Sequence, residues 1–536
     1  MCREKQNQRY LLTNAHLETF MKKLITSCII YAGFLFASMA LYGQEQQTLD
    51  TLQRKLRYFS VDNPMWLEES VEAKHTLLQL NYGTQSGGYH RAQDAQKLRN
   101  MNFNSEGSVT VKDVRLWGRF QYSNVVEDST RFGHQTRMNP SAPWYFASYG
   151  NNHYERTNYD MQFRGQRYFA DRKYALFGGL DYRIGSHFSN NDPRSTIGVI
   201  QVDGQLGGSV ALAKNIQLGV AGLYGYGQES YEIAYRNDHY ASSTLITSYL
   251  NYVVRGYGWK VGQPWLMIND MSYQNDKSRY GANAYLSVDA GFGKFYARAG
   301  YEEELQQYSQ VLRNQSRNNA LDDYRLTKLN YELLWDLRRD NKRYMAHLKS
   351  ANNRGKDKVI ESGNAANYAY QYDAHSLNLS YQVLQQRWQQ LYEARVGFMN
   401  EVRRDGGISA TFDYSRLDLG LSSLFTYQLS AEQHIELGLS ALYSQNTAMH
   451  WSLPTINENI FHQYVFYHDI IYNQADTWGG RVHLGYRQPL NNKNFLRLTA
   501  DGGYTKAVNL PELNRTTLSR PETERYDMRI TLAFGF

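Results

Sequence analysis

The chain has 536 residues, with 58 basic and 51 acidic side chains and a formal net charge of +7. This near balance is not the signature of a nucleic-acid-binding protein, so no nucleic acid is expected as a partner. Only nine prolines are present, and no linker-like stretch divides the chain into separate domains. The mean hydropathy of −0.63 is typical of a soluble protein, but hydropathy barely detects membrane strands.

Residues 21–43 have the pattern of a secretory signal peptide. Lys22 and Lys23 form its basic part, an apolar stretch follows, and small residues precede the expected cleavage after Gly43, with Ala40 as the alternative. A single-pass membrane anchor is the other interpretation of this stretch. It is disfavoured because the apolar run is shorter than the roughly 20 residues that a span needs.

Residues 1–20 are polar and charged, and we interpret them as a misassigned start ahead of the signal peptide. Both cysteines, Cys2 and Cys28, lie in the part that would be removed, so the mature chain has none. This suits an oxidising envelope compartment without a disulfide framework. Lipidation at Cys28 is disfavoured because most of the apolar stretch follows this cysteine instead of preceding it.

Residues 44–74 lack the alternation of a strand, and the stretches LDTLQRKLRYF and WLEESVEA each predict a short helix. We expect this segment either to lie in the periplasm as a lead into the first strand or to enter a barrel lumen as a small plug. It is too short for the plug domain of an energised receptor, a class with about 22 strands. We see no energy-coupling box, so the chain is not predicted to be such a receptor.

From residue 75 to residue 536, apolar and polar residues alternate in one stretch after another. In the last stretch, RYDMRITLAFGF, one face carries Tyr526, Met528, Ile530, Leu532, Phe534 and Phe536. Alternation with a period of two predicts a β-strand with one apolar and one polar face. Several such stretches run for about ten residues, the length that crosses a bilayer at a tilt, and often have a tyrosine at one end.

The connections between these stretches are alternately short and long. Eight are short, such as 112–113 and 293–294, and long ones such as 124–157 and 444–475 lie between them. Eight short turns imply nine hairpins and therefore about 18 strands, within a range of about 16 to 20 and always an even number. The least certain stretch is 228–281, because LITSYLNYVV within it has the pattern of a further strand pair.

Short turns at one end and long loops at the other are the plan of a transmembrane antiparallel β-barrel of the outer membrane. We therefore predict an all-β fold, with the barrel over residues 75–536, the turns in the periplasm and the long loops outside the cell. A soluble β-sandwich or β-helix is the alternative. It is disfavoured because no repeat of roughly 20 to 50 residues is present, and because the chain ends on an apolar strand residue.

The terminal strand, with its alternating apolar residues and final Phe536, resembles the targeting signal of Gram-negative outer-membrane β-barrel proteins. The mature chain as a whole resembles the tyrosine-rich, uncharacterised barrels of the Bacteroidota. The resemblance implies that the barrel-assembly machinery recognises the last strand. It also implies that the protein lies in the cell outer membrane, in contact with its lipid. It implies almost nothing about activity.

Charged residues of both signs fall on the inward-facing positions of the predicted strands. The candidates for lining a pore are Arg115, Arg119, Arg164, Arg183, Arg298, Arg395, Arg481, Arg497, Arg529, Asp181, Glu436 and Asp501. The same face also carries Asp160, Glu332, Glu393 and Asp413. An arginine-lined channel would favour anions, because rings of like charge set selectivity. The alternative is a salt-bridged wall that keeps the barrel rigid, and the presence of both signs favours it.

One long loop carries three histidines, His450, His462 and His468, among several aromatic residues. Imidazole is a good ligand for zinc or copper, but the spacing of these histidines matches no metal motif. We therefore predict no metal site and no other cofactor. The alternative interpretation is that the tyrosines belong to an interfacial girdle and that the histidines are solvated.

Some outer-membrane barrels are proteases that pair carboxylates with a histidine at the rim. Asp322 with Asp323, and Asp238 with His239, fall in predicted loops. Catalysis would require these groups to converge within hydrogen-bond reach, and such pairs are common in loops by chance. No Ser/His/acid signature, phosphate-binding loop or HExxH motif is present. An enzyme is therefore not expected.

The sequence thus predicts a solute channel or a transport-associated barrel. The alternative is a non-conducting accessory barrel of an uptake or secretion complex, with other envelope proteins as partners. These hypotheses differ in whether the lumen is open. The feature that separates them is whether the stretch 228–281 or the segment 44–74 folds into the lumen.

Overall fold

The computed structural model describes residues 51–237, 239–240, 249, 251–260, 271–311, 318–359, 366–430, 433–490 and 494–536. The predicted signal peptide, the twenty residues before it and both cysteines lie outside the described residues. The compact unit Thr48–Gly535 contains every helix and strand discussed below. No helix of the described residues has the length and apolar character needed to cross a membrane.

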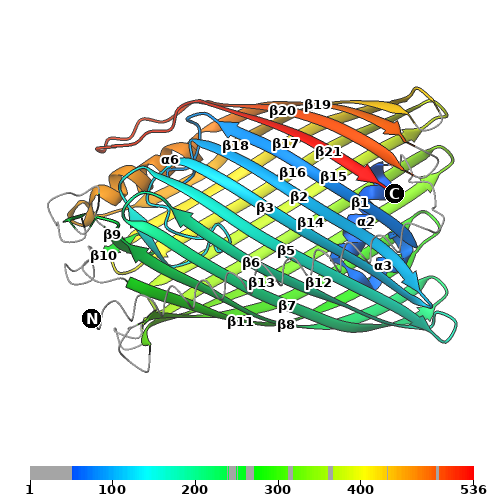
Figure 1. The fold of residues 1–536 in the computed structure, drawn as a ribbon, viewed down its shortest axis with the longest axis horizontal. Coiled ribbons are helices and arrows are strands. Elements are labelled where there is room, and N and C mark those ends of the chain that lie inside the picture. Colours follow the sequence, from blue (N-terminus) through cyan, green and yellow to red (C-terminus); the bar gives the residue numbers. More distant parts are fainter. Residues whose placement is uncertain are drawn as a thin grey trace, which may run out of the picture. The chain divides into compact units, whose positions relative to one another are not determined.

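Eighteen antiparallel strands form one closed barrel (Figure 1). Their bounds are β1 Lys74–Ser86, β2 Lys97–Val111, β3 Val114–Thr130, β5 Asn152–Phe169, β6 Tyr174–Ser189, β7 Arg194–Ala213, β8 Ile216–Ala234, β11 Met271–Asp289, β12 Lys294–Val311, β13 Asn319–Arg339, β14 Lys342–Val359, β15 Tyr368–Leu384, β16 Trp388–Asp405, β17 Ala410–Gln428, β18 His434–Ser452, β19 Asp476–Pro489, β20 Phe495–Val508 and β21 Glu524–Gly535. Each strand pairs with its neighbours along the chain, and the last strand, β21, also pairs with β1. The predicted fold and the preferred strand number are confirmed.

The two ends of the barrel differ in their connections. At one end, which we call the short-turn end, eight connections have two to five residues each. At the other, the long-loop end, seven of the nine connections are longer, and the other two, 190–193 and 406–409, have four residues each. The predicted contrast between short turns and long loops is therefore present.

The stretch 228–281 does not add a strand pair to the wall of the barrel. Its two short strands, β9 (Asn251–Arg255) and β10 (Gly258–Lys260), pair with each other, and β9 also pairs with β4 (Trp144–Ser148). These three strands form a separate sheet at the long-loop end. The residues of LITSYLNYVV before β9 lie almost entirely outside the described residues.

The wall strands have 12 to 21 residues and are longer than the roughly ten predicted. Much of the extra length replaces sequence that was expected to be loop. For example, β3 continues to Thr130 and β5 already begins at Asn152, although the loop was predicted over 124–157. The alternation of apolar and polar residues weakens near the long-loop end because inward positions there carry buried aromatic residues, such as Tyr273, Tyr308 and Tyr324, that pack against the cap.

The outer surface of the barrel is apolar, and the inner surface is polar. On β18, Ile435, Leu437 and Leu439 are 44, 45 and 58% exposed, whereas Glu436 between them is 3% exposed. The same alternation holds on the neighbouring strands, with leucines outside and charged or small residues inside. An outward apolar band with a polar interior is the arrangement that a bilayer requires of a barrel.

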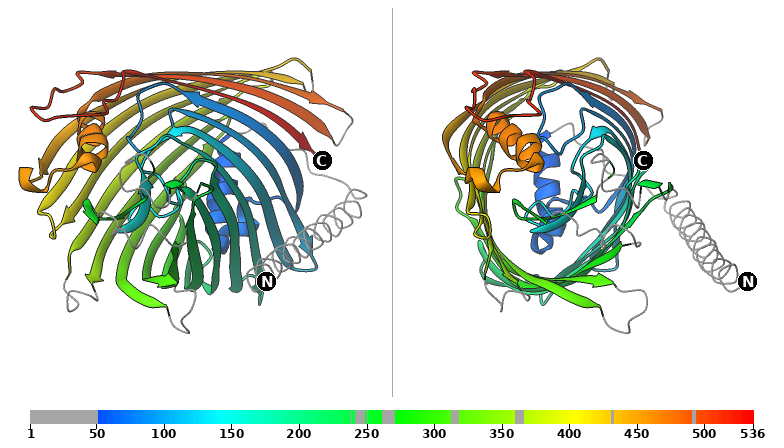
Figure 2. Two further views of the ribbon diagram at one scale, coloured as in Figure 1. Left: turned by 60° about the vertical axis from the view of Figure 1, so that its left-hand side comes forward. Right: turned by 90° about the vertical axis from the view of Figure 1, so that its left-hand side faces the viewer.

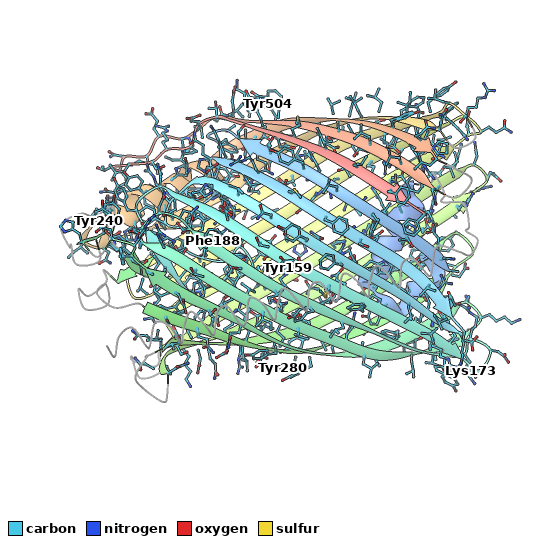
Figure 3. The ribbon with its side chains drawn as sticks, viewed as in Figure 1. Tyr159, Lys173, Phe188, Tyr240, Tyr280 and Tyr504 are labelled. Carbon is cyan, nitrogen blue, oxygen red and sulfur yellow. The ribbon has the colours of Figure 1, made fainter. Side chains whose placement is uncertain are left out.

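Aromatic side chains gather at both ends of this apolar band. Near the short-turn end, rings from β14, β15 and β16 lie side by side, namely Tyr344, Tyr381 and Tyr392. Near the long-loop end, a second set comes from β19, β20 and β21, namely Trp478, Tyr504 and Tyr526. Figure 3 shows Tyr504 on the outside of the wall together with Tyr159 and Tyr280. Two such bands match the interfacial girdles of membrane barrels.

The two faces of one strand give a direct test of this arrangement. Leu421→Arg places a charge on the outer face of β17, where Leu421 is 68% exposed. It should lower the free energy of unfolding in lipid vesicles by about 2–4 kcal/mol, as arginine does near the middle of a bilayer. The adjacent Ser422→Arg points inward beside Glu393, its register partner on β16, and should change stability by less than about 1 kcal/mol. Equal losses for both variants would contradict the assignment of the two faces.

Candidate functional site

The N-terminal segment folds inside the ring of strands at the short-turn end. It comprises α2 (Thr51–Asp62), η1 (Pro64–Trp66) and α3 (Leu67–Ser70), and we call residues 51–70 the plug. Figure 2 shows α2, in blue, within the barrel. The spacing of Leu52, Leu56 and Phe59 puts them on one buried face of α2, and Pro64 begins the next turn, a position that suits proline. Helices were predicted at these places. The sequence left open whether the segment lies in the periplasm or in the lumen, and in the structure it lies in the lumen.

The apolar side of the plug packs against the inner wall of the barrel. Phe59 stacks on Trp66 with a ring distance of 5.2 Å, and Trp66 meets the edges of Tyr285 and Tyr296 at 5.5 and 5.2 Å. The cluster also includes Leu52, Leu56, Met65, Phe177, Ala221, Leu334, Met345 and Leu391. Its wall residues come from seven strands, β6, β8, β11, β12, β13, β14 and β16, so this packing fixes the plug across a wide arc of the wall.

A buried ion pair ties the plug to the start of the barrel wall. Arg57 is 4% exposed and Glu106, on β2, is 1% exposed. Nη2 of Arg57 donates to Oε1 of Glu106 at 3.2 Å, and Nη1 lies 3.0 Å from Nε2 of His75 on β1. Removing one member of a buried pair leaves the other charge uncompensated, which is strongly destabilising. This pair therefore opposes any displacement of the plug.

Further polar contacts join the plug to the remaining sides of the wall. Nδ2 of Asn63 donates to Glu332 on β13 at 3.2 Å, and Nε of Arg164 on β5 donates to the carbonyl of Val61 at 3.0 Å. Lys55 forms an ion pair with Glu393 on β16. Among the residues that the structure describes, the plug contacts strands on nearly every side of the barrel, including β3, β12, β14 and β15.

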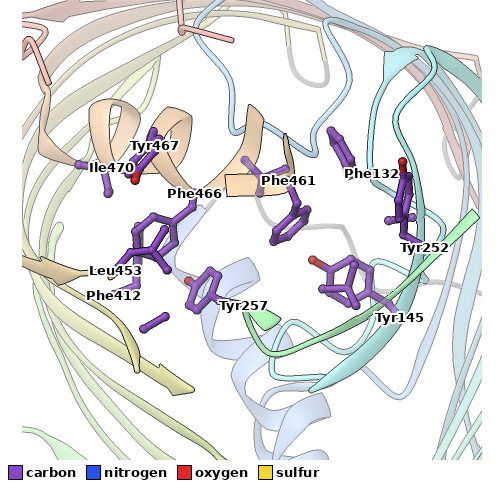
Figure 4. Close-up of a cluster of buried hydrophobic side chains, with 14 of the residues drawn as sticks. Phe132, Tyr145, Tyr252, Tyr257, Phe412, Leu453, Phe461, Phe466, Tyr467 and Ile470 are labelled. Carbon is purple, nitrogen blue, oxygen red and sulfur yellow. The ribbon is translucent and has the colours of Figure 1, made fainter. Parts of the chain in front are cut away.

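Packed loops cover the lumen at the long-loop end. We call residues 131–151, 251–260 and 453–475 the cap; they include the β4–β9–β10 sheet, η4 (His462–Phe466) and α6 (Tyr467–Gln474). Its core is an aromatic cluster with Phe132, Tyr145, Tyr257, Phe461 and Phe466 (Figure 4). Three of the six aromatic residues of the loop that carries the three histidines are thus buried in this core, and the other three pack against it or against a neighbouring cluster.

The first part of the cap folds inward and is anchored to the wall by hydrogen bonds. Thr136 donates to Glu229 on β8 at 2.6 Å, and Asn139 donates to Gln306 on β12 at 2.8 Å. Glu229 and Gln306 are 2 and 0% exposed. Because these acceptors are buried on two wall strands, they fix the position of this loop inside the lumen.

The loop histidines join separate segments of the long-loop end. The ring of His462 contacts the carbonyl of Tyr257 at 2.8 Å, and His468 contacts the carbonyl of His90 at 2.9 Å and Ser519 at 3.0 Å. His450 is exposed on β18. Among the described residues, no group of three or more metal-ligating side chains is arranged to hold a metal ion. The contacts of His462 and His468 are structural.

Of the two carboxylate pairs that suggested a protease, only Asp322 with Asp323 lies within the described residues. Asp322 is fully buried and accepts hydrogen bonds from Nε1 of Trp144 at 2.8 Å and from the backbone of Lys358 at 3.2 Å. It therefore anchors the cap to β13. Asp238 lies outside the described residues, so its pairing with His239 is not described.

Three adjacent cavities lie along the lumen between plug and cap. The inner cavity, of about 600 Å³, is bounded by Asp62 of the plug. The middle cavity, of about 380 Å³, shares Asp203, Arg279 and Glu302 with it. The outer cavity, of about 290 Å³, shares Asn139 with the middle one. The cavities thus succeed one another from cap to plug, separated by the inward-folded loop.

All twelve predicted pore-lining residues occupy inward-facing positions, and most are paired. The pairs are Arg164 with Asp181, Arg183 with Asp160, Arg481 with Asp527, Arg497 with Glu436 and His483 with Asp501. Arg115 contacts the carbonyl of Val71. No carboxylate of the described residues lies within 4.0 Å of Arg119, Arg298, Arg395 or Arg529. Many of these residues thus form a salt-bridged wall, and their role in a pore stays a prediction.

Sequence reasoning missed several luminal residues that hold plug and cap. Arg279 bonds both Glu304, at 2.5 Å, and Asp203, at 2.8 Å, yet it was not among the candidates. It lies in the stretch 228–281 that was predicted as a long loop, whereas the structure places it on the inward face of β11. Glu106 and Glu229 also have inward parity, but their partners in the plug and cap are far away in the sequence.

The last strand has the geometry expected of it. Tyr526, Met528, Ile530 and Leu532 are 40 to 49% exposed on the outer face. The strand pairs with β20 on one side and with β1 on the other, which closes the barrel. Its recognition by the assembly machinery stays a prediction.

The buried ion pair of the plug gives a second testable prediction. Arg57→Ala should lower the free energy that holds the plug in place by about 3 kcal/mol, because buried Glu106 loses its guanidinium partner and keeps His75, 3.6 Å away, as a weaker neighbour. Tyr58→Ala, on the same helix but 41% exposed, should cost less than about 1 kcal/mol. Hydrogen exchange of residues 51–70 in the folded protein measures both. Similar protection in the two variants would show that the ion pair does not hold the plug.

The cap should weaken in acid. Burial lowers the pKa of His134 to about 3 and lowers the pKa of His462 and His468. An opened cap would bind protons below about pH 6.5 that the closed cap excludes, so stability falls as pH falls. From pH 7.5 to pH 5 the loss is up to about 2 kcal/mol per histidine. Burial raises the pKa of Asp469 to about 6, an opposing contribution of about 1.4 kcal/mol.

The measurement is hydrogen exchange of residues 461–474 at the two pH values, corrected for intrinsic rates. We expect faster exchange at pH 5 and a smaller difference in His134→Gln. Exchange at pH 5 that is equal to or slower than at pH 7.5 would contradict the assignment of neutral, buried histidines.

Among solved structures, the copper transporter OprC is 8% identical with a TM-score of 0.38; the match covers 86% of this chain and 80% of that chain. BauA, the ferric preacinetobactin receptor from Acinetobacter baumannii, is 10% identical with a TM-score of 0.38 and the same coverage. A Pseudomonas aeruginosa FadL homologue is 11% identical with a TM-score of 0.32, covering 89% and 93%. No curated protein matches the chain. A family model matches residues 64–536, and the chain therefore belongs to a family of unknown function, DUF6850.

Proposed function

We propose that this chain is an outer-membrane β-barrel that admits a small polar solute through its lumen, with the plug and the cap as gates. The observation that carries the proposal is the succession of three polar cavities between cap and plug. A barrel of 16–18 strands is wide enough to enclose an aqueous path. In this view the three cavities are the parts of that path that remain when the plug and the cap are both closed.

The outer surface supports the location in the outer membrane. The apolar band and the two aromatic bands would face the lipid. The short-turn end would lie in the periplasm and the long-loop end outside the cell. The plug would then be the periplasmic gate and the cap the extracellular one. The assembly machinery would engage β21 before this strand pairs with β1, with Tyr526, Met528, Ile530 and Leu532 on its lipid face.

The two gates differ in how they are held. The plug is held by aromatic packing and by the buried pair of Arg57 and Glu106. The cap is held by its aromatic core, by hydrogen bonds of its inward loop to the wall and by the ion pair of Arg137 with the buried Glu127. Because local stability follows buried apolar contact and buried charge pairing, solute entry would need the cap loop to exchange these contacts. Release would need the plug to shift as a unit.

A second candidate function is a non-conducting accessory barrel of a larger envelope complex. The same plug contacts favour it, because a lumen held shut on nearly every side is compatible with a purely structural or docking role. Binding partners would then engage the long-loop end. For both candidates we propose a non-enzymatic role, which the structural contacts of Asp322, His462 and His468 support.

Single-channel recording in planar bilayers distinguishes the two candidates. The mature chain, residues 44–536, should be closed for most of the time. Phe59→Ala combined with Trp66→Ala should give longer and more frequent openings, because each truncation removes about 3–5 kcal/mol of aromatic packing. Tyr58→Ala, exposed on the same helix, should behave as the wild type.

Heat-modifiable gel mobility shows that each variant is folded. A folded double variant that remains silent would contradict the gated channel and leave the accessory barrel as the better account.

A further inference from the structure

The inner cavity is lined by charged side chains of both signs. Five basic residues line it, and they are Arg164, Arg279, Arg298, Lys349 and Arg395. Six acidic residues line it as well, and they are Asp62, Asp181, Asp203, Glu302, Glu332 and Asp418. The formal charges nearly cancel, so the cavity as a whole is not built for an anion alone. Some of these charges form ion pairs within the protein, and others do not.

Most of them are paired within the protein. Arg164 bonds Asp181 at 2.9 Å, and Arg279 bonds Asp203 at 2.8 Å. Lys349 bonds Glu332 at 3.0 Å. Glu302 is paired with Lys328 at 2.9 Å on the neighbouring strand. These pairs are part of the salt-bridged wall and do not need a ligand.

Two guanidinium groups of the cavity have no such partner. Arg298, on β12, donates from Nε to the amide oxygen of Asn283 at 3.1 Å, and this neutral group leaves its charge uncompensated. Arg395, on β16, is exposed to the cavity. In the part of the chain that the structure describes, no carboxylate lies within 4.0 Å of either guanidinium. Both therefore offer forked donors to an anionic group.

Two carboxylates of the same cavity have no cationic group in direct contact. Asp62 is the last residue of α2 and faces the cavity from the plug. Asp418, on β17, accepts a hydrogen bond from the hydroxyl of Ser444, which is neutral. Within the described residues, no basic group lies within 4.0 Å of either carboxylate. Lys349 and Arg164 act on Asp62 only from a longer distance. Charges of both signs without a direct partner thus remain in a single cavity.

A ligand that carries both signs would compensate these four groups at once. Partly enclosed charges are costly unless they are paired and hydrogen-bonded. A ligand carboxylate suits the guanidiniums of Arg298 and Arg395, and a ligand ammonium suits Asp62 and Asp418. A volume of about 600 Å³ lies in the range of small-molecule sites.

We propose that the inner cavity binds a small zwitterion, an amino acid or a short peptide with free amino and carboxyl groups. The proposal rests on the proposed function and names the class of solute that the lumen admits. Because Asp62 belongs to the plug, the bound ammonium contacts the gate itself. Occupancy of the cavity is thereby coupled to the position of the plug.

The test uses the full mature chain in detergent micelles and isothermal titration with three probes. Trialanine carries both charges, N-acetyl-trialanine only the carboxylate, and trialanine amide only the ammonium. We expect saturable binding of trialanine and about tenfold weaker binding, or none, for each blocked form, because each lacks one charge-assisted contact. Alanine and dialanine, titrated in the same way, distinguish a free amino acid from a peptide as the preferred ligand.

Paired variants assign the two ends of the ligand. Arg298→Gln with Arg395→Gln should weaken trialanine about tenfold and abolish its advantage over trialanine amide. Asp62→Asn with Asp418→Asn should weaken trialanine similarly and abolish its advantage over N-acetyl-trialanine. The matched control is Arg481→Gln with Asp527→Asn, a luminal pair at 2.7 Å that does not line the inner cavity. It should leave all affinities unchanged.

Two outcomes would overturn the proposal. Equal binding of trialanine and N-acetyl-trialanine would make the cavity a simple anion site. No binding of any of the peptides or of alanine by folded wild-type protein would mean that water and salt ions alone compensate the four charges. Binding is measured at equilibrium, so a failure here is distinct from a failure of the channel. Silence in the bilayer with intact trialanine binding would refute conduction and not the site.

Discussion

The closure of β21 onto β1 is the constraint on which the rest of the structure depends. In a bilayer the backbone of a strand has no water to bond with, so every strand must be paired on both sides. Ten residues of β1 pair with β21, and this contact turns an open sheet into a ring. Once the ring is closed, one parity of each strand faces lipid and the other faces a confined lumen. Every inward charge must then find its partner inside that lumen.

Neighbouring wall strands supply partners for many of the inward-facing charges, and the plug and the cap supply partners for others. Neighbouring strands supply pairs such as Arg164 with Asp181, while Arg57 of the plug supplies the partner of Glu106. The cap anchors its inward loop on Glu229 and Gln306. Among the described inward charges without an oppositely charged group within 4.0 Å, Arg298, Arg395, Asp62 and Asp418 line the inner cavity together, whereas Arg119 and Arg529 do not line it. The distribution of charge thus points to the region where a solute would be held.

The architecture could be predicted from the sequence because the outward-facing residues meet lipid, which makes the strands apolar at every second position. Leucines and tyrosines at every second position identify the strands, including the strictly alternating last strand. The partners of inward charges could not be predicted in this way. Whether Arg497 meets Glu436 depends on how β18, β19 and β20 are aligned, and alternation alone does not fix that register.

The plug and the cap were harder still, for a different physical reason. The helices at 51–62 and 64–70 are amphipathic, and such helices are equally compatible with the periplasm and with the lumen. Only the contacts of Phe59 and Trp66 with Tyr285 and Tyr296 decide between the two locations, and these residues lie more than 200 positions apart. The cap loops likewise have no periodic signal, since their aromatic side chains pack in an irregular core.

The central claim is that the plug is a gate whose displacement opens the lumen. Residues 44–536 contain no cysteine, so a single engineered pair, Asn63→Cys with Glu332→Cys, can join the plug to β13 where these side chains now share a hydrogen bond. The measurement is the flux of a small zwitterion such as trialanine into proteoliposomes, before and after reduction of that disulfide. The account predicts flux only after reduction. Equal flux in the two states, or none in either, would contradict it.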